Sequence, residues 1–357
     1  MRVPIFDLSR VFNPFRNHFH ASLDRCLDNN NFILGEEVKS FEEEFSEKSD
    51  SKYCVGMSSG TDALLAMFMA LDLAPGDEII VPSFTFVSSA SAIIRAGLKP
   101  VFADLGEDSF HIDLDTIKRS CGEKTKGVLF VHLFGEYVDI SDISDFCKKE
   151  KIFLLEDCAQ SFGKNNIGYG EAQVYSFFPA KNLGCLGDGG CITVGSYDFY
   201  EKLKMIRTHG SRKKYHYEIL GGNFRLDALQ ASFLRTLLAQ SDVWIDKRCD
   251  NASYYIDSLQ NISSIEVPSS SLNHSWNQFT LRVDDRDGLK SHLDKNGIQS
   301  AIYYPMPLHH SGTIFESKSP MPETEQRCKE VLSIPIYPGL LEKEREYVVK
   351  KIKEYLK

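Results

Sequence analysis

One lysine in the sequence has the setting that amine chemistry requires. Lys181 lies in the stretch SFFPAKNLGCLGDGG at 176–190, after apolar or small residues and before a glycine-rich loop. Most lysines are solvated surface charges, but this one is expected in a crowded, partly desolvated pocket. Burial lowers the pKa of an amine, and an unprotonated amine attacks carbonyl groups. The sequence therefore indicates that Lys181 forms an imine with a carbonyl compound.

A carboxylate follows another buried segment. The apolar run IFLLED at 152–157 ends in Asp157, and Gln160 stands three residues later. A buried carboxylate needs a cationic or hydrogen-bonding partner, because an unpaired buried charge is costly. A pyridinium nitrogen would meet this need, and so would a neighbouring Lys or Arg in a structural salt bridge. The residues alone leave these two interpretations open.

A third group has the composition of a phosphate site. Ser59, Gly60 and Thr61 follow the apolar run YCVGM and lead into a helical pattern, in SSGTDAL. Backbone N–H groups and the helix dipole at such a turn attract phosphate. Ser and Thr are also the commonest helix N-caps, so this motif alone does not decide between the two roles.

The elements that must position these residues follow an α/β pattern. Runs rich in Val, Ile, Leu and Phe suit strands buried on both faces of a mostly parallel sheet, and they occur at 53–57, 78–82, 99–104, 127–134 and 152–157. Two shorter strands, VYSFF and CITVG, flank the glycine-rich loop, and 197–244 is mainly helical. Because ligands collect at the carboxyl ends of such strands, Lys181 and Asp157 are expected near one another. A second α+β pattern, with a strand at 278–283, predicts domains at 1–245 and 246–357.

Composition excludes several classes of partner. The net charge is −9, which disfavours a nucleic-acid or anionic-membrane surface. The nine cysteines are scattered without a CxxC pair, which is typical of free thiols in a reducing compartment and gives no metal site. No stretch has the length and hydrophobicity of a membrane span, so we expect a cytoplasmic protein.

Five motifs together resemble one known family. SSGTDAL, PSFTF, EDCAQ, SFFPAKNLGCLGDGG and GGNFRLDALQA, in this order and at these intervals, are similar to the DegT-type sugar-nucleotide aminotransferases. The resemblance extends from PIFDL to LSIPIYPGL. It implies the fold-type I architecture of pyridoxal 5'-phosphate (PLP) enzymes: a large domain with a seven-stranded, mostly parallel sheet between helices, and a smaller C-terminal α+β domain. It also implies a homodimer with active sites shared between subunits.

The resemblance assigns roles to individual residues. It places Lys181 in an imine with PLP, Asp157 on the pyridine nitrogen, Gln160 on the ring hydroxyl oxygen and Phe86 in a stack on the ring. The phosphate ligands that it implies are Gly60, Thr61 and Ser176, with Asn223 reaching across from the partner subunit.

Other positions of the resemblance concern the substrate. Arg225 falls near the sugar nucleotide or the donor carboxylate, with an interface salt bridge as the alternative. His309, in YYPMPLHH, falls near the sugar, although it is also compatible with a surface position. A basic stretch, RTHGSRKK, would suit a pyrophosphate or be a solvated charge run; its cations are Arg207, Arg212, Lys213 and Lys214. The connection between Gln160 and Ser176 is shorter than usual in the family, so its conformation is not predicted.

The implied activity is transfer of an amino group from glutamate to a UDP- or dTDP-linked keto-hexose, with a lean towards C-3. Such products feed amino-sugar and surface-polysaccharide synthesis, as in lipopolysaccharide O-antigen. Two alternatives have the same fold: a PLP-dependent sugar dehydratase, which has histidine in place of the lysine, and a non-catalytic regulatory protein. Lys181 argues against the first, and the retention of Asp157, Gln160 and Ser176 beside it argues against the second.

Overall fold

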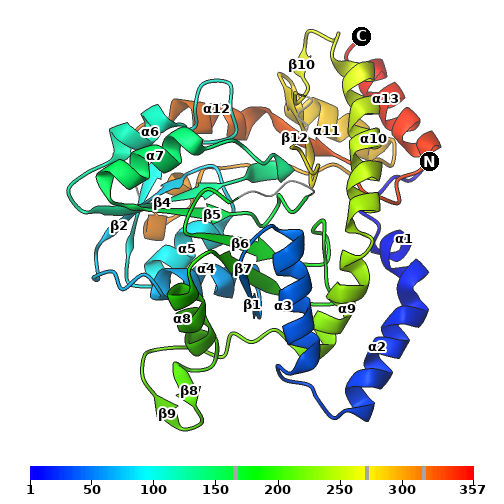
Figure 1. The fold of residues 1–357 in the computed structure, drawn as a ribbon. Helices are drawn as coiled ribbons and strands as arrows, with labels where there is room; N and C mark the ends of the chain where they lie inside the picture. Colours follow the sequence, from blue (N-terminus) through cyan, green and yellow to red (C-terminus); the bar gives the residue numbers. More distant parts are fainter. Residues whose placement is uncertain (164–167, 270–272, 316–318) are drawn as a thin grey trace.

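A seven-stranded sheet forms the centre of the larger unit (Figure 1). The computed structural model describes residues 1–357 except 164–167, 270–272 and 316–318. The strand order is β1-β7-β6-β5-β4-β2-β3, and only β7 runs against its neighbours. The strands are β1 (Tyr53–Met57), β2 (Glu78–Pro82), β3 (Lys99–Ala103), β4 (Thr125–Val131), β5 (Phe153–Asp157), β6 (Ala172–Ser176) and β7 (Gly190–Val194). This confirms the mostly parallel sheet expected from the sequence.

Helices cover both faces of this sheet. The strand residues alternate between the two layers, so that Ile79 and Val81 of β2 pack into one core and Ile80 into the other. One layer holds α4 (Gly60–Met69), α5 (Val87–Arg95) and α8 (Tyr197–Arg207). The opposite layer holds α3 (Glu36–Lys48), α6 (Leu114–Ser120), α7 (Ser141–Glu150) and α9 (Ala228–Leu238).

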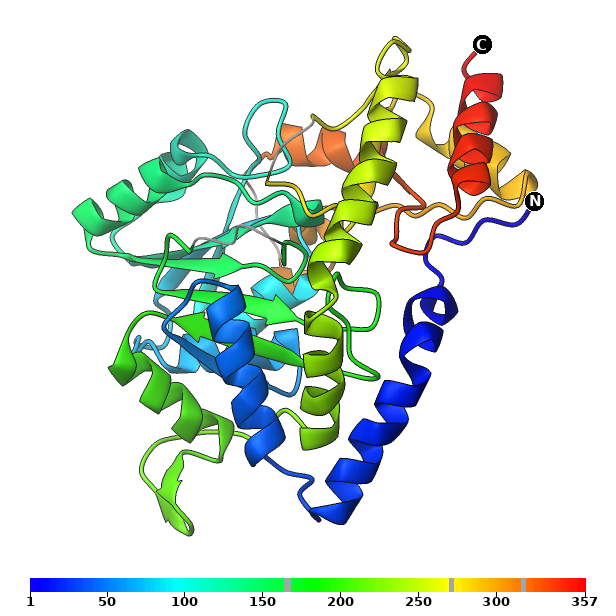
Figure 2. The same cartoon turned by 45° about the vertical axis from the view of Figure 1, so that its right-hand side comes forward.

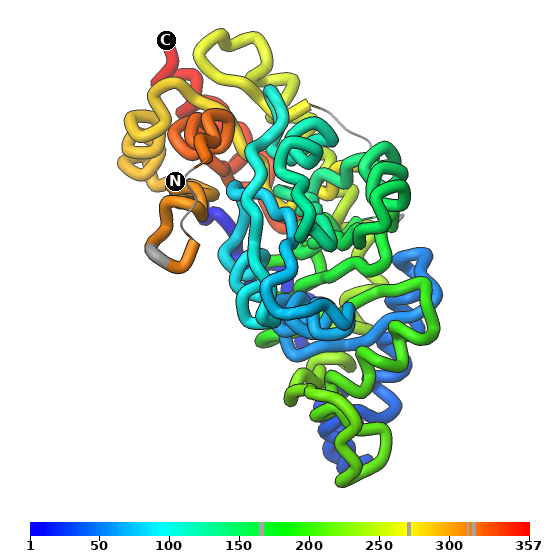
Figure 3. The backbone as a smooth tube through the Cα atoms, turned by 90° about the vertical axis from the view of Figure 1, so that its left-hand side faces the viewer, coloured from blue at the N-terminus to red at the C-terminus, as the bar shows by residue number. Residues whose placement is uncertain are grey.

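The N-terminal helices and a hairpin extend from the larger unit (Figures 1 and 2). Helix α2 (Arg16–Asp28) follows α1 (Leu8–Phe12) and packs on α9. The hairpin of β8 (Ser211–Lys213) and β9 (His216–Tyr217) lies at the end of the molecule away from the C-terminus (Figure 3). No pattern in the sequence indicated this hairpin, because its residues are polar and exposed. The short 3₁₀ helices are η1 (Asn13–Phe15), η2 (Leu133–Gly135), η3 (Leu308–His310) and η4 (Thr313–Phe315).

The smaller unit is an antiparallel sheet covered by helices, and the expected strand at 278–283 is its middle strand. Its strand order is β10-β11-β12, and a separate core binds the unit together. The elements are β10 (Ile265–Glu266), β11 (Phe279–Val283), β12 (Val331–Ile334), α11 (Arg286–Lys295), α12 (Pro322–Glu330) and α13 (Glu342–Tyr355). Val3 also packs into this core and pairs with Ile298.

One helix joins the two units. Helix α10 (Ser241–Leu259) runs without interruption through residue 245, where the sequence predicts a domain boundary. From this helix the fully buried Arg248 donates hydrogen bonds to the carbonyl oxygens of Trp276, at 2.7 Å, and Ile336, at 3.1 Å, and more weakly to that of Asn277, at 3.4 Å. Helix α10 therefore anchors the main chain of the segment before β11 through Arg248. Among the described residues, no helix combines the length and the apolar character needed to span a bilayer.

Candidate functional site

A cavity of about 500 Å³ lies at the carboxyl ends of the parallel strands. Ten residues are placed by the resemblance at the cofactor or the substrate, and seven of them line the cavity: Gly60, Thr61, Phe86, Asp157, Gln160, Ser176 and Lys181. The other three, Asn223, Arg225 and His309, are not among its lining residues. The carboxyl ends of the strands thus bring the amine, the carboxylate and the phosphate motif to one place.

Lys181 stands on the turn that leaves β6. Its backbone N–H donates to the carbonyl oxygen of Phe178 at 2.8 Å, which closes the turn. A Cβ on Gly184 would lie 2.4 Å from the oxygen of Pro179, so the following loop can approach this turn only as glycine. Desolvation lowers the pKa of Lys181 to about 8, against a smaller opposing attraction to Asp157. The amine is therefore partly unprotonated near neutral pH.

Asp157 ends β5 inside the molecule. Its Oδ2 accepts a hydrogen bond of 2.8 Å from Ser89 of α5, and its Oδ1 accepts one of 3.1 Å from the N–H of Ala159. Burial nevertheless raises the pKa of Asp157 above its ordinary value. No salt bridge joins this carboxylate to a Lys or Arg among the described residues within 4.0 Å. A cationic ligand at this position would therefore form the ion pair with Asp157 that no described Lys or Arg forms.

The phosphate motif is built by a close approach of three backbone segments. Ser59 caps α4, and its hydroxyl accepts the N–H of Asp62 at 3.0 Å. A Cβ on Gly60 would lie 2.8 Å from Cβ of Ser176, and one on Gly190 would lie 2.7 Å from N of Gly60. The glycines therefore bring the N-terminus of α4, the end of β6 and the start of β7 together at the cavity wall. Both roles of Ser59 and Gly60, cap and anion cradle, are compatible in this arrangement.

Gln160 links the larger unit to a residue that sequence reasoning did not single out. Its Oε1 accepts a hydrogen bond of 2.6 Å from the N–H of Phe134, which has a left-handed φ of 60°. Its Nε2 donates to the hydroxyl of Tyr304 at 3.3 Å. The ring of Phe86, 55% exposed, lies 6.4 Å from that of Tyr304. Tyr304 belongs to the YYPMPLHH segment noted in the sequence. Its hydrogen-bond partner, Gln160, is more than a hundred residues away along the chain, so the contact could not be predicted.

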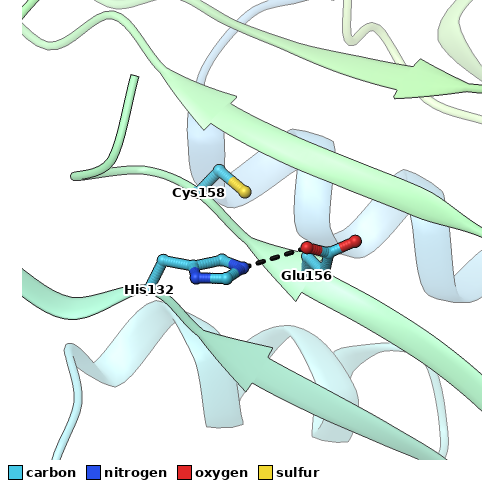
Figure 4. Close-up of side chains that lie close together, drawn as sticks. All are labelled: His132, Glu156 and Cys158. Atoms are coloured by element: carbon cyan, nitrogen blue, oxygen red, sulfur yellow. Dashed lines mark hydrogen bonds and ion pairs between the residues drawn. The ribbon is translucent and has the colours of Figure 1, made fainter. Parts of the chain in front are cut away.

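Behind Asp157 lies a buried group of His132, Glu156 and Cys158 (Figure 4). Glu156 accepts hydrogen bonds of 2.8–3.0 Å from five donors: His132 Nε2, Tyr137 Oη, the N–H groups of Tyr169 and Gly170, and Gln173 Nε2. Nδ1 of His132 accepts the N–H of Val138 at 3.1 Å, so Nε2 carries the proton that is donated to Glu156. These donors keep the pKa of Glu156 low despite burial, whereas burial raises that of Cys158 well above its usual range.

That hydrogen-bonded group fixes the segments around the cavity. The donors to Glu156 are His132 and Tyr137 after β4, Tyr169 and Gly170 just before β6, and Gln173 within β6. The ligand atoms of His132 and Glu156 are already engaged with one another and with these donors. We therefore interpret the group as structural: its hydrogen bonds hold together segments that surround the active site.

Asn223 and Arg225 lie on the chain between α8 and α9. Asn223 is exposed and pairs with Thr208, while Arg225 pairs with Met57 beside the end of β1. The buried Nε of Arg225 has no hydrogen-bond partner among the described residues. Arg225 thus lies near the start of the phosphate motif, and neither residue lines the cavity of the same chain.

His309 and the basic stretch occupy other places. His309 is 3% exposed, and its Nδ1 lies 2.6 Å from the hydroxyl of Ser83. The basic stretch is divided: Arg207 is buried in an ion pair with Glu42, whereas Arg212 and Lys213 are on the exposed strand β8. Arg207 therefore does not belong to a solvated charge run.

Besides Tyr304, three lining residues from beyond residue 245 were not singled out in the sequence. Asn277 and Gln278 precede β11, and Tyr303 comes before Tyr304. All three enter the cavity from beyond residue 245, so no local pattern around Lys181 indicated them. The hydrogen bond from Asn277 Nδ2 to Asn182 Oδ1, 3.0 Å long, connects this wall to the lysine turn.

Comparison with known proteins gives relatives over the whole length. A protein of Geobacillus stearothermophilus named pleiotropic regulatory protein is 37% identical, with 99% of each chain covered. The dTDP-3-amino-3,4,6-trideoxy-alpha-D-glucose transaminase of Streptomyces venezuelae is 35% identical, covering 99% of this chain and 96% of that one.

Solved structures agree with these relatives. The structure of S. venezuelae DesV in complex with a ketimine intermediate matches with a TM-score of 0.96 at 35% identity, over 100% of this chain and 99% of that chain. The Bacillus subtilis protein ntda with bound cofactor pmp has a TM-score of 0.96 at 29% identity, over 99% and 85%. The profile of the DegT/DnrJ/EryC1/StrS aminotransferase family matches residues 15–353, so the chain belongs to that family.

Proposed function

We propose that this protein transfers an amino group from glutamate to the ketone of a nucleotide-linked sugar, with PLP as cofactor. The observation that carries the proposal is the pairing of Lys181 and Asp157 in one cavity. The first is an amine whose pKa is lowered to about 8, and the second is a buried carboxylate available to a cation.

The residues fit PLP in three separate ways. The N-terminus of α4 and the contact of Gly60 with Ser176 form a cradle that a side chain would fill, which suits a phosphate. Asp157 suits a protonated ring nitrogen, and Lys181 suits an aldehyde carbon. When bound, PLP supplies an electron sink for the bond-breaking steps at the amino-acid carbon.

The roles of the chain follow from these positions. Lys181 would hold the aldehyde of PLP, and its amine would move a proton at the α-carbon of the donor. Asp157 keeps the ring nitrogen protonated, with Ser89 fixing one carboxylate oxygen. Phe86 restricts the plane of the ring, and Gln160 receives its orientation from Phe134 and Tyr304.

The sugar-nucleotide assignment is supported by the relatives. The S. venezuelae transaminase is named for a dTDP sugar that carries its amino group at C-3. We therefore retain C-3 as the favoured position, with UDP or dTDP as the carrier. The products would serve amino-sugar synthesis, including surface polysaccharides, in the cytoplasm.

A homodimer with shared sites is part of the proposal. Asn223 and Arg225 do not line the cavity of their own chain, and the Nε of Arg225 is buried without a partner among the described residues. A second subunit would give both residues a cavity to complete. Arg225 would then act on the anionic part of the substrate and Asn223 on the phosphate of the cofactor.

A regulatory function is the second candidate, because one relative has that name. The two candidates separate in a two-step experiment. Purified protein with PLP is first mixed with glutamate, and conversion to the pyridoxamine form is followed by absorbance. Candidate 3-keto and 4-keto sugar nucleotides are then added, and products are identified by mass spectrometry.

An aminotransferase converts the cofactor with glutamate and yields an amino sugar, and Lys181→Met abolishes both steps. Lys204→Met, at a lysine of α8 that is paired with Glu201, is the matched control and retains them. A deoxy sugar without an amino group would instead indicate the dehydratase. Absence of any spectral change with glutamate would favour the regulatory function.

A further inference from the structure

Two side-chain oxygens in the cavity wall lack a hydrogen-bond partner. Asn277 and Gln278 both line the cavity, immediately before β11. Oδ1 of Asn277 and Oε1 of Gln278 are buried, and no described residue donates to either of them. Asn277 as a whole is only 6% exposed. A buried carbonyl oxygen without a donor is unfavourable, so such a pair at a cavity needs an explanation.

The orientation of the Asn277 amide is fixed by its neighbour. Nδ2 of Asn182 donates to the carbonyl oxygens of Phe162 and Ser275, each at 3.0 Å. The other end of the Asn182 amide is therefore the oxygen Oδ1. Oδ1 of Asn182 can only accept a hydrogen bond, and it lies 3.0 Å from Nδ2 of Asn277. Turning Asn277 over would bring two oxygens together. Oδ1 of Asn277 is therefore an acceptor by necessity.

Two hydrogen bonds hold the main chain of Asn277 and Gln278. The carbonyl oxygen of Asn277 accepts from Arg248, and the N–H of Gln278 donates to the oxygen of Phe134 at 3.0 Å. The side chain of Gln278 has no hydrogen bond to a described residue. Its amide can therefore present either the oxygen or the NH₂ group to the cavity. The main chain that carries both amides is thus held at the cavity.

We infer that Asn277 and Gln278 form a recognition site for hydroxyl groups of the sugar ring next to the carbon that receives the amino group. The inference rests on the proposed function and names the substrate class more closely: a keto sugar with a hydroxyl beside the ketone. Oδ1 of Asn277 repels a carboxylate or phosphate, since it only accepts. Asn182 follows Lys181 directly, which places this wall on the side of the reacting group.

The test uses two 3-keto sugar nucleotides that differ only in the presence or absence of the hydroxyl at C-4. The rate of amination of each is measured with the holoenzyme in its amino form. The wild type should prefer the hydroxylated sugar by about tenfold to a hundredfold in kcat/KM, because the deoxy sugar leaves a buried acceptor unpaired. In Gln278→Met, which keeps the volume and removes the amide, the preference should shrink towards unity.

Asn277→Ala provides a second arm with the same ratio as the readout, so that a general loss of rate does not imitate the effect. Gln260→Met, at the exposed end of α10, is the control and should retain the wild-type ratio. Equal rates for both sugars in the wild type, or an unchanged preference in both cavity variants, would overturn the inference and leave the proposed function standing. Amination of neither sugar, with no other keto sugar nucleotide accepted, would overturn both.

Discussion

The hydroxyl of Ser89 donates a hydrogen bond of 2.8 Å to Oδ2 of Asp157. This bond and the N–H of Ala159 are the largest contributions that oppose the effect of burial on the pKa of Asp157. The first turn of α5 therefore supports the carboxylate that we assign to the ring nitrogen.

Removal of this bond should weaken cofactor binding. We expect Ser89→Ala to raise the pKa of Asp157 further and to reduce the affinity for PLP by about tenfold, since hydrogen bonds to charged groups contribute about 1.5–3 kcal/mol. Titration of the cofactor-free protein with PLP measures the change. Ser91→Ala, on the same helix but bonded to the backbone of Ser88, should bind normally. Equal affinities in the two variants would contradict the role given to Ser89.

Asp157 should lower the stability of the cofactor-free protein. Its folded-state pKa is raised by burial, so the folded form disfavours the charged carboxylate. The penalty is absent below the unfolded-state pKa of about 4 and grows as the pH rises through the folded-state pKa. Cofactor-free Asp157→Asn should therefore melt at a higher temperature than the wild type at pH 8, with the difference vanishing towards pH 4.

With PLP present the order should reverse, because only the wild type gains the bond to a charged ring nitrogen. The turnover of Asp157→Asn should fall by more than a hundredfold if the carboxylate controls the ring. Thermal scans with and without PLP measure the first effect. A variant that is active and responds to PLP like the wild type would show that Asp157 is a structural residue.

The lowered pKa of Lys181 predicts the pH dependence of covalent cofactor capture. Burial disfavours the charged amine, so half of the amine is unprotonated at about pH 8. Below that pH the capture rate should rise about tenfold per unit, and above it the rate should level off. Stopped-flow mixing of PLP with cofactor-free protein gives the profile, and borohydride reduction followed by peptide mapping locates the lysine. A rate that still rises at pH 10 would contradict the desolvated setting.

Glu156 should be needed as a carboxylate. In Glu156→Gln the new NH₂ group faces either the Nε2–H of His132 or the N–H groups of Tyr169 and Gly170, so a donor meets a donor. We expect the free energy of unfolding to fall by about 2 kcal/mol at pH 7. The exposed Glu123→Gln is the control.

The effect should depend on pH in a defined direction. Hydrogen bonds lower the folded-state pKa of Glu156, so its stabilisation is present above about pH 4.5 and is lost as the pH falls through the lowered pKa. The wild type and Glu156→Gln should therefore converge in strong acid. Urea unfolding at a series of pH values measures this, and a constant difference would argue for a packing effect alone.

Shared sites predict complementation between inactive variants. If Lys181 acts in its own subunit and Arg225 in the partner's cavity, mixed dimers of Lys181→Ala and Arg225→Ala contain one intact site. Random reassociation gives roughly half mixed dimers and so about a quarter of the wild-type activity. The variants are unfolded together, refolded and assayed, with mass spectrometry to verify mixing.

Lys181→Ala mixed with Asp157→Ala is the negative control, because both lesions belong to one cavity and every site in the mixed dimer then has one. Recovery in both mixtures would point to a cause other than site sharing. Failure of the Arg225 mixture despite proven mixed dimers, with Arg225→Ala inactive alone, would exclude the shared site.

The sequence predicted those features that depend on local pattern. The apolar runs at 53–57, 78–82 and 152–157 became strands because residues buried on both faces leave little alternative. Since parallel strands end at one edge, Asp157 and Lys181 could be placed together before their distance was known. The glycine-rich loop after Lys181 was also evident in the sequence, but the close backbone approaches of Gly184 and Gly190 are visible only in the structure.

Features that depend on distant packing were not predictable in this way. Arg207 reads as part of a basic stretch, yet it pairs with Glu42, 165 residues away. Tyr304 and Asn277 enter the cavity from beyond residue 245, and only the docking of the smaller unit places them beside Gln160 and Asn182. His309 was expected near the sugar, but only the fold reveals its contact with Ser83.

The anchoring by Arg248 has a consequence for the divergence of the family. Its guanidinium donates to the backbone oxygens of Trp276 and Ile336. Arg248 thereby holds the main chain next to the proposed recognition site without using the side chains of Asn277 and Gln278. Substitutions at these two positions would then change which sugar is accepted while this backbone anchor remains. A wall that is constrained at its backbone and variable at its surface allows new specificities to arise one residue at a time.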